Sequence, residues 1–224
     1  NAPNLPPVEG RVLVPLDFAQ TGGLAGPVSL KKNLDIDLTV KKLDIAKTAL
    51  AAGRKIDAQG TVDAEVKISG QVLNPTAVLV LNMSGISTSA VKQKLSPAGG
   101  TISLSLRDRK LESLVNLTQK PLQPLKAEGS IPFDVEKILR DPSSLNATPL
   151  NFTLNLPDSD LSGLRPFVEA IESMKGTLGL NAKVAGTLMK PVITGEFHAS
   201  APAVAFKKAD LPDARDVKVR LRFE

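Results

Sequence analysis

Two short features of the sequence contain residue types that could carry chemistry. The chain has one histidine, His198, between Phe197 and Ala199, whereas a zinc site needs several His or Cys ligands. Asp158-Ser-Asp160 matches the start of a calcium-binding loop, but the Gly and Glu that such a loop needs later are missing. We therefore expect no metal and no cofactor. His198 is predicted to be a surface residue on the polar face of a strand, and the aspartates to serve in helix capping.

Nucleophilic, phosphate-binding and nucleic-acid-binding patterns are also incomplete. The chain has no cysteine, which excludes a thiolate nucleophile and a disulfide framework, and no serine sits in a nucleophile elbow. The glycine pairs in 21–23 and 98–100 are not followed by the Lys of a phosphate loop. Lys218, Arg220 and Arg222 form a basic stripe, but base-stacking aromatics are only 3% of the chain. We predict no enzyme and no nucleic-acid partner; attraction to anionic lipid head groups stays open.

Composition limits the class of protein. The 224 residues suffice for one large domain or two small ones, 42% of them are apolar, and every aromatic residue is Phe. The net charge of +5 is dispersed along the chain. No apolar run approaches the ~20 residues of a membrane-spanning helix. Asn1 and Ala2 look like the remnant of a cleaved tag, so we expect a piece of a longer chain whose membrane anchor lies outside it.

The dominant pattern is a strict alternation of apolar and polar residues, which gives a strand one apolar and one wet face. This pattern favours an antiparallel sheet over a parallel sheet covered on both sides. The expected strands are 34–41, 61–68, 101–107, 150–156, 177–184 and 217–224. The predicted fold class is therefore mainly β: an elongated, curved antiparallel sheet with a few short helices.

Turn-forming residues separate the strands. Residues 107–110, Arg-Asp-Arg-Lys, are expected to join two strands of a hairpin. Pro75 and Pro191 are each expected to lie in a turn between two strands, because proline presets φ and cannot donate to a ladder. Each proline follows a glycine by five residues, Gly70 or Gly186, and these glycines are expected to mark a bulge or a sharp bend.

Short helices are predicted at 43–53, 134–141 and 165–176. In the first, Asp44 is expected to be the N-cap and Gly53 to end the helix. The second would end before Pro142. The apolar face of the third would consist of Phe167, Ile171 and Met174.

An internal repeat becomes visible when 60–85 is placed over 176–201, at an offset of 116 residues. Six of the 26 positions are identical: Gly60/Gly176, Thr61/Thr177, Lys67/Lys183, Gly70/Gly186, Pro75/Pro191 and Ser84/Ser200. An alternating strand and a short helix precede each copy. We predict a flexible lead-in with the tag remnant at 1–7, one repeat unit at 8–127 and a second at 128–224, continuous in one elongated β body.

These residues carry a family resemblance. The stretch KGTLGLNAKVAGTLMKPVITGEFHASAPAVAF (175–206), followed by DARDVKVRLRF (213–223), resembles the repeats of the TamB branch of the AsmA-like proteins. DLSGLRPFVEAIESMKG (160–176) is similar to the Leu-rich short helix that leads to Gly in that family, and AEGSIPFDV (127–135) to the strand that opens its units. The resemblance covers roughly 8–224 and rests on pattern rather than on a catalytic motif.

The resemblance implies a long protein that is anchored in the inner membrane of a Gram-negative-type bacterium and crosses the periplasm. It implies a taco-like curved sheet with an apolar inner face, and a non-enzymatic role in moving phospholipid towards the outer membrane and in outer-membrane biogenesis. The family's outer-membrane partner, TamA, would be contacted by other parts of the full chain. The chain would be an internal stretch of the groove.

Combining the alternation with the resemblance identifies candidate groove-lining residues. They are Ile36, Leu38, Val62, Val66, Ile68, Ile102, Leu104, Leu106, Phe152, Leu154, Leu178, Leu180, Val184, Phe197, Val219 and Leu221. About a dozen strands spaced ~4.8 Å apart would give a trough of roughly 58 Å. From the sequence alone, the same faces could instead pack in a closed sandwich, as in a structural or binding domain of a cell-envelope protein, or could accept a protein strand by edge pairing.

Overall fold

The computed structural model describes residues 7–16, 28–30, 32–88, 96–168, 170–207 and 212–224. Nearly all of the predicted lead-in at 1–7, and the glycine pair in 21–23, lie outside the described residues. The strands are β1 (Val8–Leu13), β2 (Asn33–Asp44), β3 (Gln59–Gln71), β4 (Asn74–Ser87), β5 (Ala98–Arg107), β6 (Lys110–Thr118), β7 (Leu125–Pro132), β8 (Asn151–Asp160), β9 (Ile171–Gly186), β10 (Pro191–Phe206) and β11 (Ala214–Phe223). The helical segments are α1 (Ile45–Ala51), α2 (Val135–Arg140) and the 3₁₀ turns η1 (Pro142–Ala147) and η2 (Leu161–Phe167).

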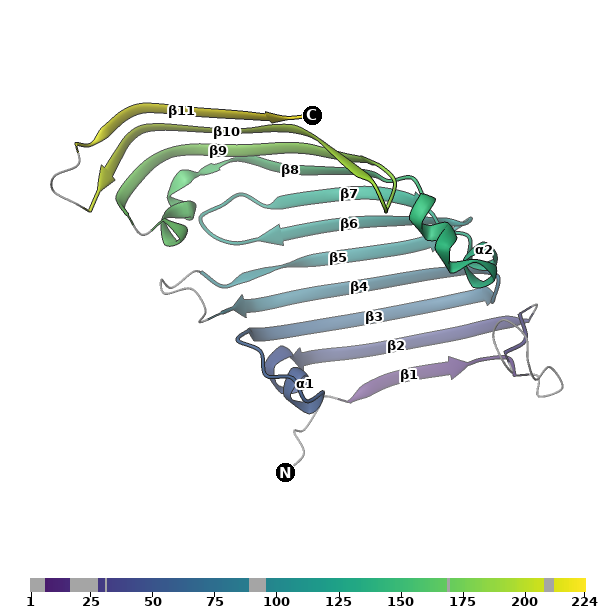
Figure 1. Ribbon diagram of the computed structural model, residues 1–224. Coiled ribbons are helices and arrows are strands. Elements are labelled where there is room, and N and C mark those ends of the chain that lie inside the picture. Colours follow the sequence, from purple (N-terminus) through teal and green to yellow (C-terminus); the bar gives the residue numbers. More distant parts are fainter. Residues whose placement is uncertain (1–6, 17–27, 31, 89–95, 169, 208–211) are drawn as a thin grey trace.

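These strands form a single antiparallel sheet whose spatial order is the order of the sequence, β1 to β11 (Figure 1). Each strand pairs with the next, so β1 and β11 are the two edges and the sheet is not closed. The prediction of a mainly β, curved antiparallel fold is confirmed. The closed sandwich is wrong for the described part of the chain, because all of its named strands belong to this one sheet.

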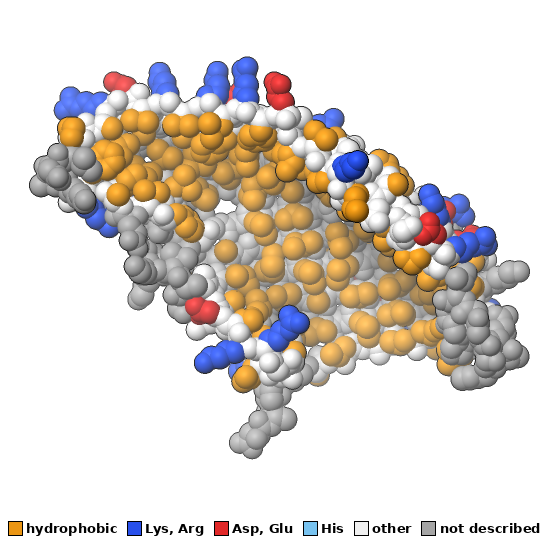
Figure 2. Space-filling view, in the orientation of Figure 1, with side chains coloured by type: hydrophobic (Ala, Val, Ile, Leu, Met, Phe, Trp, Pro, Cys, Tyr) orange, Lys and Arg blue, Asp and Glu red, His pale blue; other side chains and the backbone are white. Residues whose placement is uncertain are grey.

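The sheet is a single layer, and it is hollowed on one side. Figure 2 shows hydrophobic side chains spread over the hollowed side and Lys and Arg side chains along the rim at the top. The accessible surface of the chain is 14833 Å², whereas a compact monomer of 23.6 kDa would have about 9,800 Å². The excess follows from the architecture, since an open sheet leaves both of its faces without a second layer.

The hairpin of β5 and β6 turns at Asp108 and Arg109, as the Arg-Asp-Arg-Lys motif predicts. Both residues have positive φ, 49° and 57°, and Arg107 pairs directly with Lys110. Positive φ at both central residues is the geometry of a type I′ turn, whose twist matches that of the two strands.

The two Gly-x-x-x-x-Pro motifs form hairpins in a different way from the prediction. Gly70 is the cross-strand partner of Pro75, and Gly186 is the partner of Pro191. Pro75 is therefore the second residue of β4 and Pro191 the first of β10, and neither lies in the turn. The expected bulge is also wrong: no register shift occurs at either glycine. Both glycines instead have left-handed φ, +94° and +83°, which side chains rarely tolerate.

Two of the three predicted helices are confirmed. Helix α1 has Asp44 as its N-cap, whose carboxylate accepts the backbone N–H of Lys47 at 3.0 Å, and Gly53 with φ +73° follows its end. Helix α2 is capped in the same way by Asp134, whose carboxylate accepts the backbone N–H of Lys137 at 3.0 Å.

The predicted helix at 165–176 is wrong. The 3₁₀ turn η2 ends at Phe167 and strand β9 begins at Ile171. Apolar residues three and four apart suggested a helix, but Met174 pairs with Val204 of β10 and is only 7% exposed. Pairing with β10 and burial of Met174 therefore outweigh the helical spacing, which is a weak local preference.

Irregularities of the ladder recur at the offset of the sequence repeat. The register shifts between Val40 and Leu43 in β2, and again 116 residues later between Leu156 and Ser159 in β8. Shifts also occur beside Gly60 and beside Gly176. These coincidences support the duplication, while the division into units at 8–127 and 128–224 stays a prediction.

We predict that Gly186→Ala lowers the free energy of unfolding by about 1–3 kcal/mol, because it places a side chain at a left-handed φ. The added Cβ would also lie 2.5 Å from the carbonyl oxygen of Lys190. Gly53→Ala is the control, because its φ is also left-handed but nothing lies within 4 Å of its Cβ position. Chemical denaturation measures both. Equal losses at the two positions would contradict a steric constraint at the hairpin.

Candidate functional site

A continuous apolar row crosses the whole sheet. Starting at β1, each member is the direct cross-strand partner of the next, so all members lie on the same face. The row consists of Val8, Val40, Ala64, Leu81, Ile102, Val115, Ala127, Leu154, Ala182, Gly195 and Phe223. We call it the central row, the face that carries it the inner face, and the opposite face the outer face.

Every candidate groove residue predicted from the sequence lies on the inner face. Ile102 and Leu154 belong to the central row. Each of the others either lies an even number of residues from a row member in its own strand, or is the cross-strand partner of such a residue. On the central row and on the neighbouring row through Leu38 and Leu104, no described residue is charged and Ser113 is the one polar side chain. The inner face can therefore offer apolar contact but neither acid–base chemistry nor metal ligands along these rows.

The inner face is only partly covered. Of the candidate residues, Leu106 and Leu178 are buried, at 8% and 2% exposure, whereas Val219 and Leu221 are exposed. The other candidates are half-buried; Phe197 among them packs against the buried cluster that contains Leu161. In a closed core these aliphatic side chains would be almost completely buried. That they contact lipid stays a prediction.

Glycine makes room for the largest side chain near the middle of the inner face. Gly129 of β7 pairs with Phe152 of β8. A Cβ added at Gly129 would overlap the ring of Phe152 and approach the carbonyl oxygen of Asn151 at 2.5 Å. The ring therefore occupies the space above the glycine, in contact with the neighbouring strand.

One end of the inner face is covered by η2. Leu161 of η2 is 7% exposed and packs with Met174, Leu178, Ala201 and Val204, which are all buried. Further apolar side chains around this cluster are Leu122, Leu156, Leu164, Ile171, Phe197, Ala199, Phe206, Ala214 and Val217. Sequence reasoning missed this cover, because it assigned 165–176 to a helix. The packing of η2 on β9 can be recognised only once β9 is known to begin at Ile171.

One of the two aspartates that the sequence associated with calcium holds η2 in place. Asp160 is the N-cap of η2 and accepts the backbone N–H of Ser162 at 2.8 Å. This hydrogen bond lowers the pKa of the Asp160 carboxyl. The cap therefore contributes stability above the ordinary pKa and loses it as the pH falls through the lowered value. The prediction of a capping role is confirmed for Asp160.

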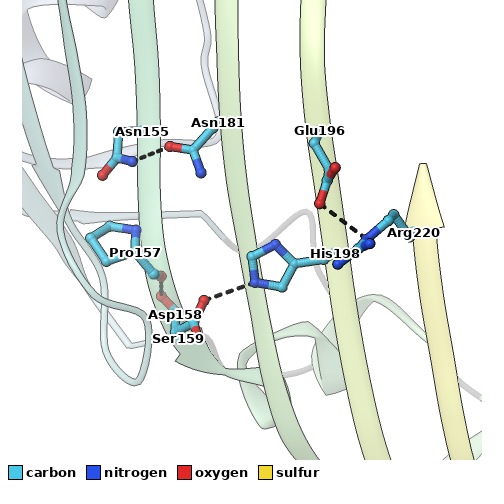
Figure 3. A network of polar contacts seen from close by, with 8 residues as sticks. All are labelled: Asn155, Pro157, Asp158, Ser159, Asn181, Glu196, His198 and Arg220. Carbon is cyan, nitrogen blue, oxygen red and sulfur yellow. Dashed lines mark hydrogen bonds and ion pairs between the residues drawn. The ribbon is translucent and has the colours of Figure 1, made fainter. Parts of the chain in front are cut away.

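His198 lies on the outer face, as predicted, within a polar network (Figure 3). Its Nε2 is 2.8 Å from Oδ1 of Asp158, which lies in β8, two strands away. Gly179 of the intervening strand makes this contact possible, since an added Cβ would lie 2.5 Å from the imidazole. The adjacent Ser159 is on the inner side, pairs with Leu178 and donates its hydroxyl to the carbonyl oxygen of Pro157 at 2.7 Å. It therefore does not complete a triad with His198.

Two arginines of the basic stripe on β11 share one carboxylate of the neighbouring strand β10. Arg220 and Arg222 each place Nε 3.1 Å from a different carboxylate oxygen of Glu196. Figure 3 shows the pair of Glu196 and Arg220. Both arginine side chains are about two-thirds exposed, at 67% and 69%, so these ion pairs contribute little to stability. A solvated outer face therefore accounts for the stripe.

Within the described residues, no group of His, Cys, Asp and Glu has the arrangement of a metal site. None of the helices in that part of the chain combines the length and the apolarity needed to cross a bilayer.

Comparison with known proteins gives one match. The family model described as TamB, N-terminal domain, matches residues 24–199. A search of curated proteins and a search of solved structures each found no match. The matched residues include β2 to β9 and most of β10, and so most of the inner face.

We predict that Leu161→Ala destabilises the protein by about 2–5 kcal/mol, because it removes a buried side chain and leaves a cavity under η2. Leu114→Ala is the matched control, since Leu114 lies on the outer face with 54% exposure, and it should change stability by less than about 0.5 kcal/mol. Urea denaturation compares the two variants. A loss at Leu161 no larger than at Leu114 would mean that η2 does not hold the end of the inner face.

Proposed function

Because the chain belongs to the TamB family, a component of the translocation and assembly module of the cell envelope, we propose that its inner face shields the acyl chains of phospholipids as they cross the periplasm. In this proposal the chain is part of a protein anchored in the inner membrane, acts without catalysis, and contributes to outer-membrane biogenesis. An outer-membrane protein of the TamA type would be contacted by other parts of the full protein.

The observation that carries the proposal is the unbroken central row on a face that the described chain covers only in part. Its eleven members are all apolar or glycine and belong to eleven consecutive strands. Ten steps of ~4.8 Å give the row a length of about 48 Å. One leaflet of a bilayer has a hydrocarbon depth of roughly 15 Å, so the row is long enough for an acyl chain to move along it without leaving apolar contact.

The energetic benefit comes from the methylene groups of the lipid. Each CH₂ that leaves water gains about 0.8 kcal/mol, so even partial shielding of a long acyl chain amounts to several kcal/mol. The inner face gains as well, because its half-exposed aliphatic side chains are themselves removed from water. Movement along the row costs little when successive positions offer the same kind of contact.

The head group would remain at the open side of the sheet. The central row and the row beside it through Leu38 carry no charged side chain, and a desolvated phosphate without a partner is costly. The proposal thus assigns the chain selectivity for acyl chains rather than for a particular head group.

A second occupant of the inner face would be a protein segment. Both edges of the sheet, β1 and β11, carry backbone groups with no neighbouring described strand, and such edges can accept an added strand. The uncharged length of the inner face favours lipid, because a folded protein partner would present polar side chains as well.

We predict that Leu180→Asp and Leu104→Asp each weaken binding of a fluorescent fatty acid at least tenfold, because each places a carboxylate on the inner face. Asn181→Asp is the control. Asn181 lies on the outer face beside Leu180, its side-chain oxygen accepts from Asn155, and an aspartate keeps that acceptor.

Mass spectrometry of organic extracts should find phospholipid with the unmodified chain and with Asn181→Asp, and much less with the inner-face variants. Equal effects of inner-face and outer-face changes, or repeated preparations without lipid, would contradict the proposal.

A further inference from the structure

The turn between β9 and β10 is unusually apolar. Its two central residues are Leu188 and Met189, which are 46% and 68% exposed. Two-residue hairpin turns usually contain Asn, Asp or Gly, and the β5–β6 turn at Asp108 and Arg109 is polar. Turn geometry therefore does not require large apolar residues here.

The apolar surface continues from the turn into the adjacent strand. Val192 and Ile193 of β10 are 49% and 52% exposed. Strand β11 ends opposite Gly195, so Val192 and Ile193 have no cross-strand partner in β11. Ile193 pairs with Val184 on the inner face. We call Leu188, Met189, Val192 and Ile193 the apolar tip; all four are exposed at the end of this hairpin, with Ile193 on the inner face and Val192, its neighbour in the strand, on the outer face.

The backbone of the turn is already satisfied by the protein. The N–H of Thr187 donates to the carbonyl oxygen of Lys190, and the N–H of Lys190 donates to the carbonyl oxygen of Thr187, both at 3.1 Å. The N–H groups of Leu188 and Met189 donate to the carbonyl oxygens of Thr148 and Asn146, also at 3.1 Å. All four turn N–H groups therefore have protein partners and need no water.

This combination suits an apolar environment. In hydrocarbon an unpaired backbone N–H costs several kcal/mol, so a loop can enter lipid only when its donors are paired within the protein. Here η1 supplies two of the acceptors, which lie in or directly after Pro142–Ala147. The same contacts tie the backbone of the turn to the rest of the protein, while the side chains of Leu188 and Met189 stay exposed.

We propose that the apolar tip inserts into the interface of a lipid bilayer and so brings the inner face against the membrane. A bilayer fits better than a folded protein, because four side chains are far fewer than the 20–30 residues per side of a standard protein interface. The exposed Lys190 next to the tip suits lipid phosphate groups. Insertion does not require that the inner face binds acyl chains, so it goes beyond the proposed function.

Vesicle flotation of the 224-residue chain tests the proposal. Phosphatidylcholine vesicles, with and without phosphatidylglycerol, should carry the unmodified chain, and the anionic vesicles should carry more of it. The double variant Leu188→Ser, Met189→Ser should float at least fivefold less. Leu114→Ser is the control, because Leu114 is an equally exposed leucine, 54%, far from the tip in sequence; its flotation should be unchanged.

A second measurement reports the position of the tip directly. The chain has no cysteine, so Met189→Cys can carry a single environment-sensitive fluorophore. Its emission should shift to the blue on vesicles and be quenched by lipids with spin-labelled acyl chains. A probe that stays in water, flotation of the double variant equal to the unmodified chain, or an effect of the double variant on self-association alone would overturn the proposal.

Fatty-acid binding separates this inference from the proposed function. The double tip variant should bind a fluorescent fatty acid in the absence of vesicles as the unmodified chain does. Leu180→Asp should lose that binding but keep an inserted tip. Loss of both properties in the tip variant would overturn insertion as an independent function of the tip.

Discussion

The structure depends on one constraint: the inner face of the sheet is apolar from edge to edge, and within the described residues no second sheet covers it. The central row runs from Val8 to Phe223 without a charged residue, and the candidate residues around it are mostly half-buried. Each methylene group that such a face exposes to water is unfavourable. In the proposed function acyl chains occupy this face for part of the time, and the absence of charge along the central row favours them as the occupant.

Other features keep the face continuous while the sheet bends. Left-handed glycines such as Gly186 close the hairpins, and Gly129 leaves space for the ring of Phe152. Bulges at equivalent places in β2 and β8 alter the local twist. Charges are kept on the outer face, where His198 with Asp158 and Glu196 with Arg220 connect neighbouring strands in water. The 3₁₀ turn η2 covers one end, so the inner face is not equally open along its length.

Much of this architecture could be predicted from the sequence, because a period of two residues determines both the strands and their apolar face. The same period placed every candidate groove residue on one side. The helix predicted over Phe167, Ile171 and Met174 failed because the spacing of three apolar residues cannot report the pairing of Met174 with Val204. The cover by Leu161 and the contact of His198 across Gly179 depend on strands distant in sequence, and no local pattern encodes them.

The central claim is that the inner face, and not the outer face, holds acyl chains. Photo-crosslinking tests it most directly: a benzophenone amino acid replaces Ile102 of the central row, or its outer-face neighbour Ser103, in the chain isolated with its lipids. Mass spectrometry should find phospholipid attached at position 102 and little at position 103. Equal lipid adducts at both positions, or protein adducts alone at position 102, would contradict the account.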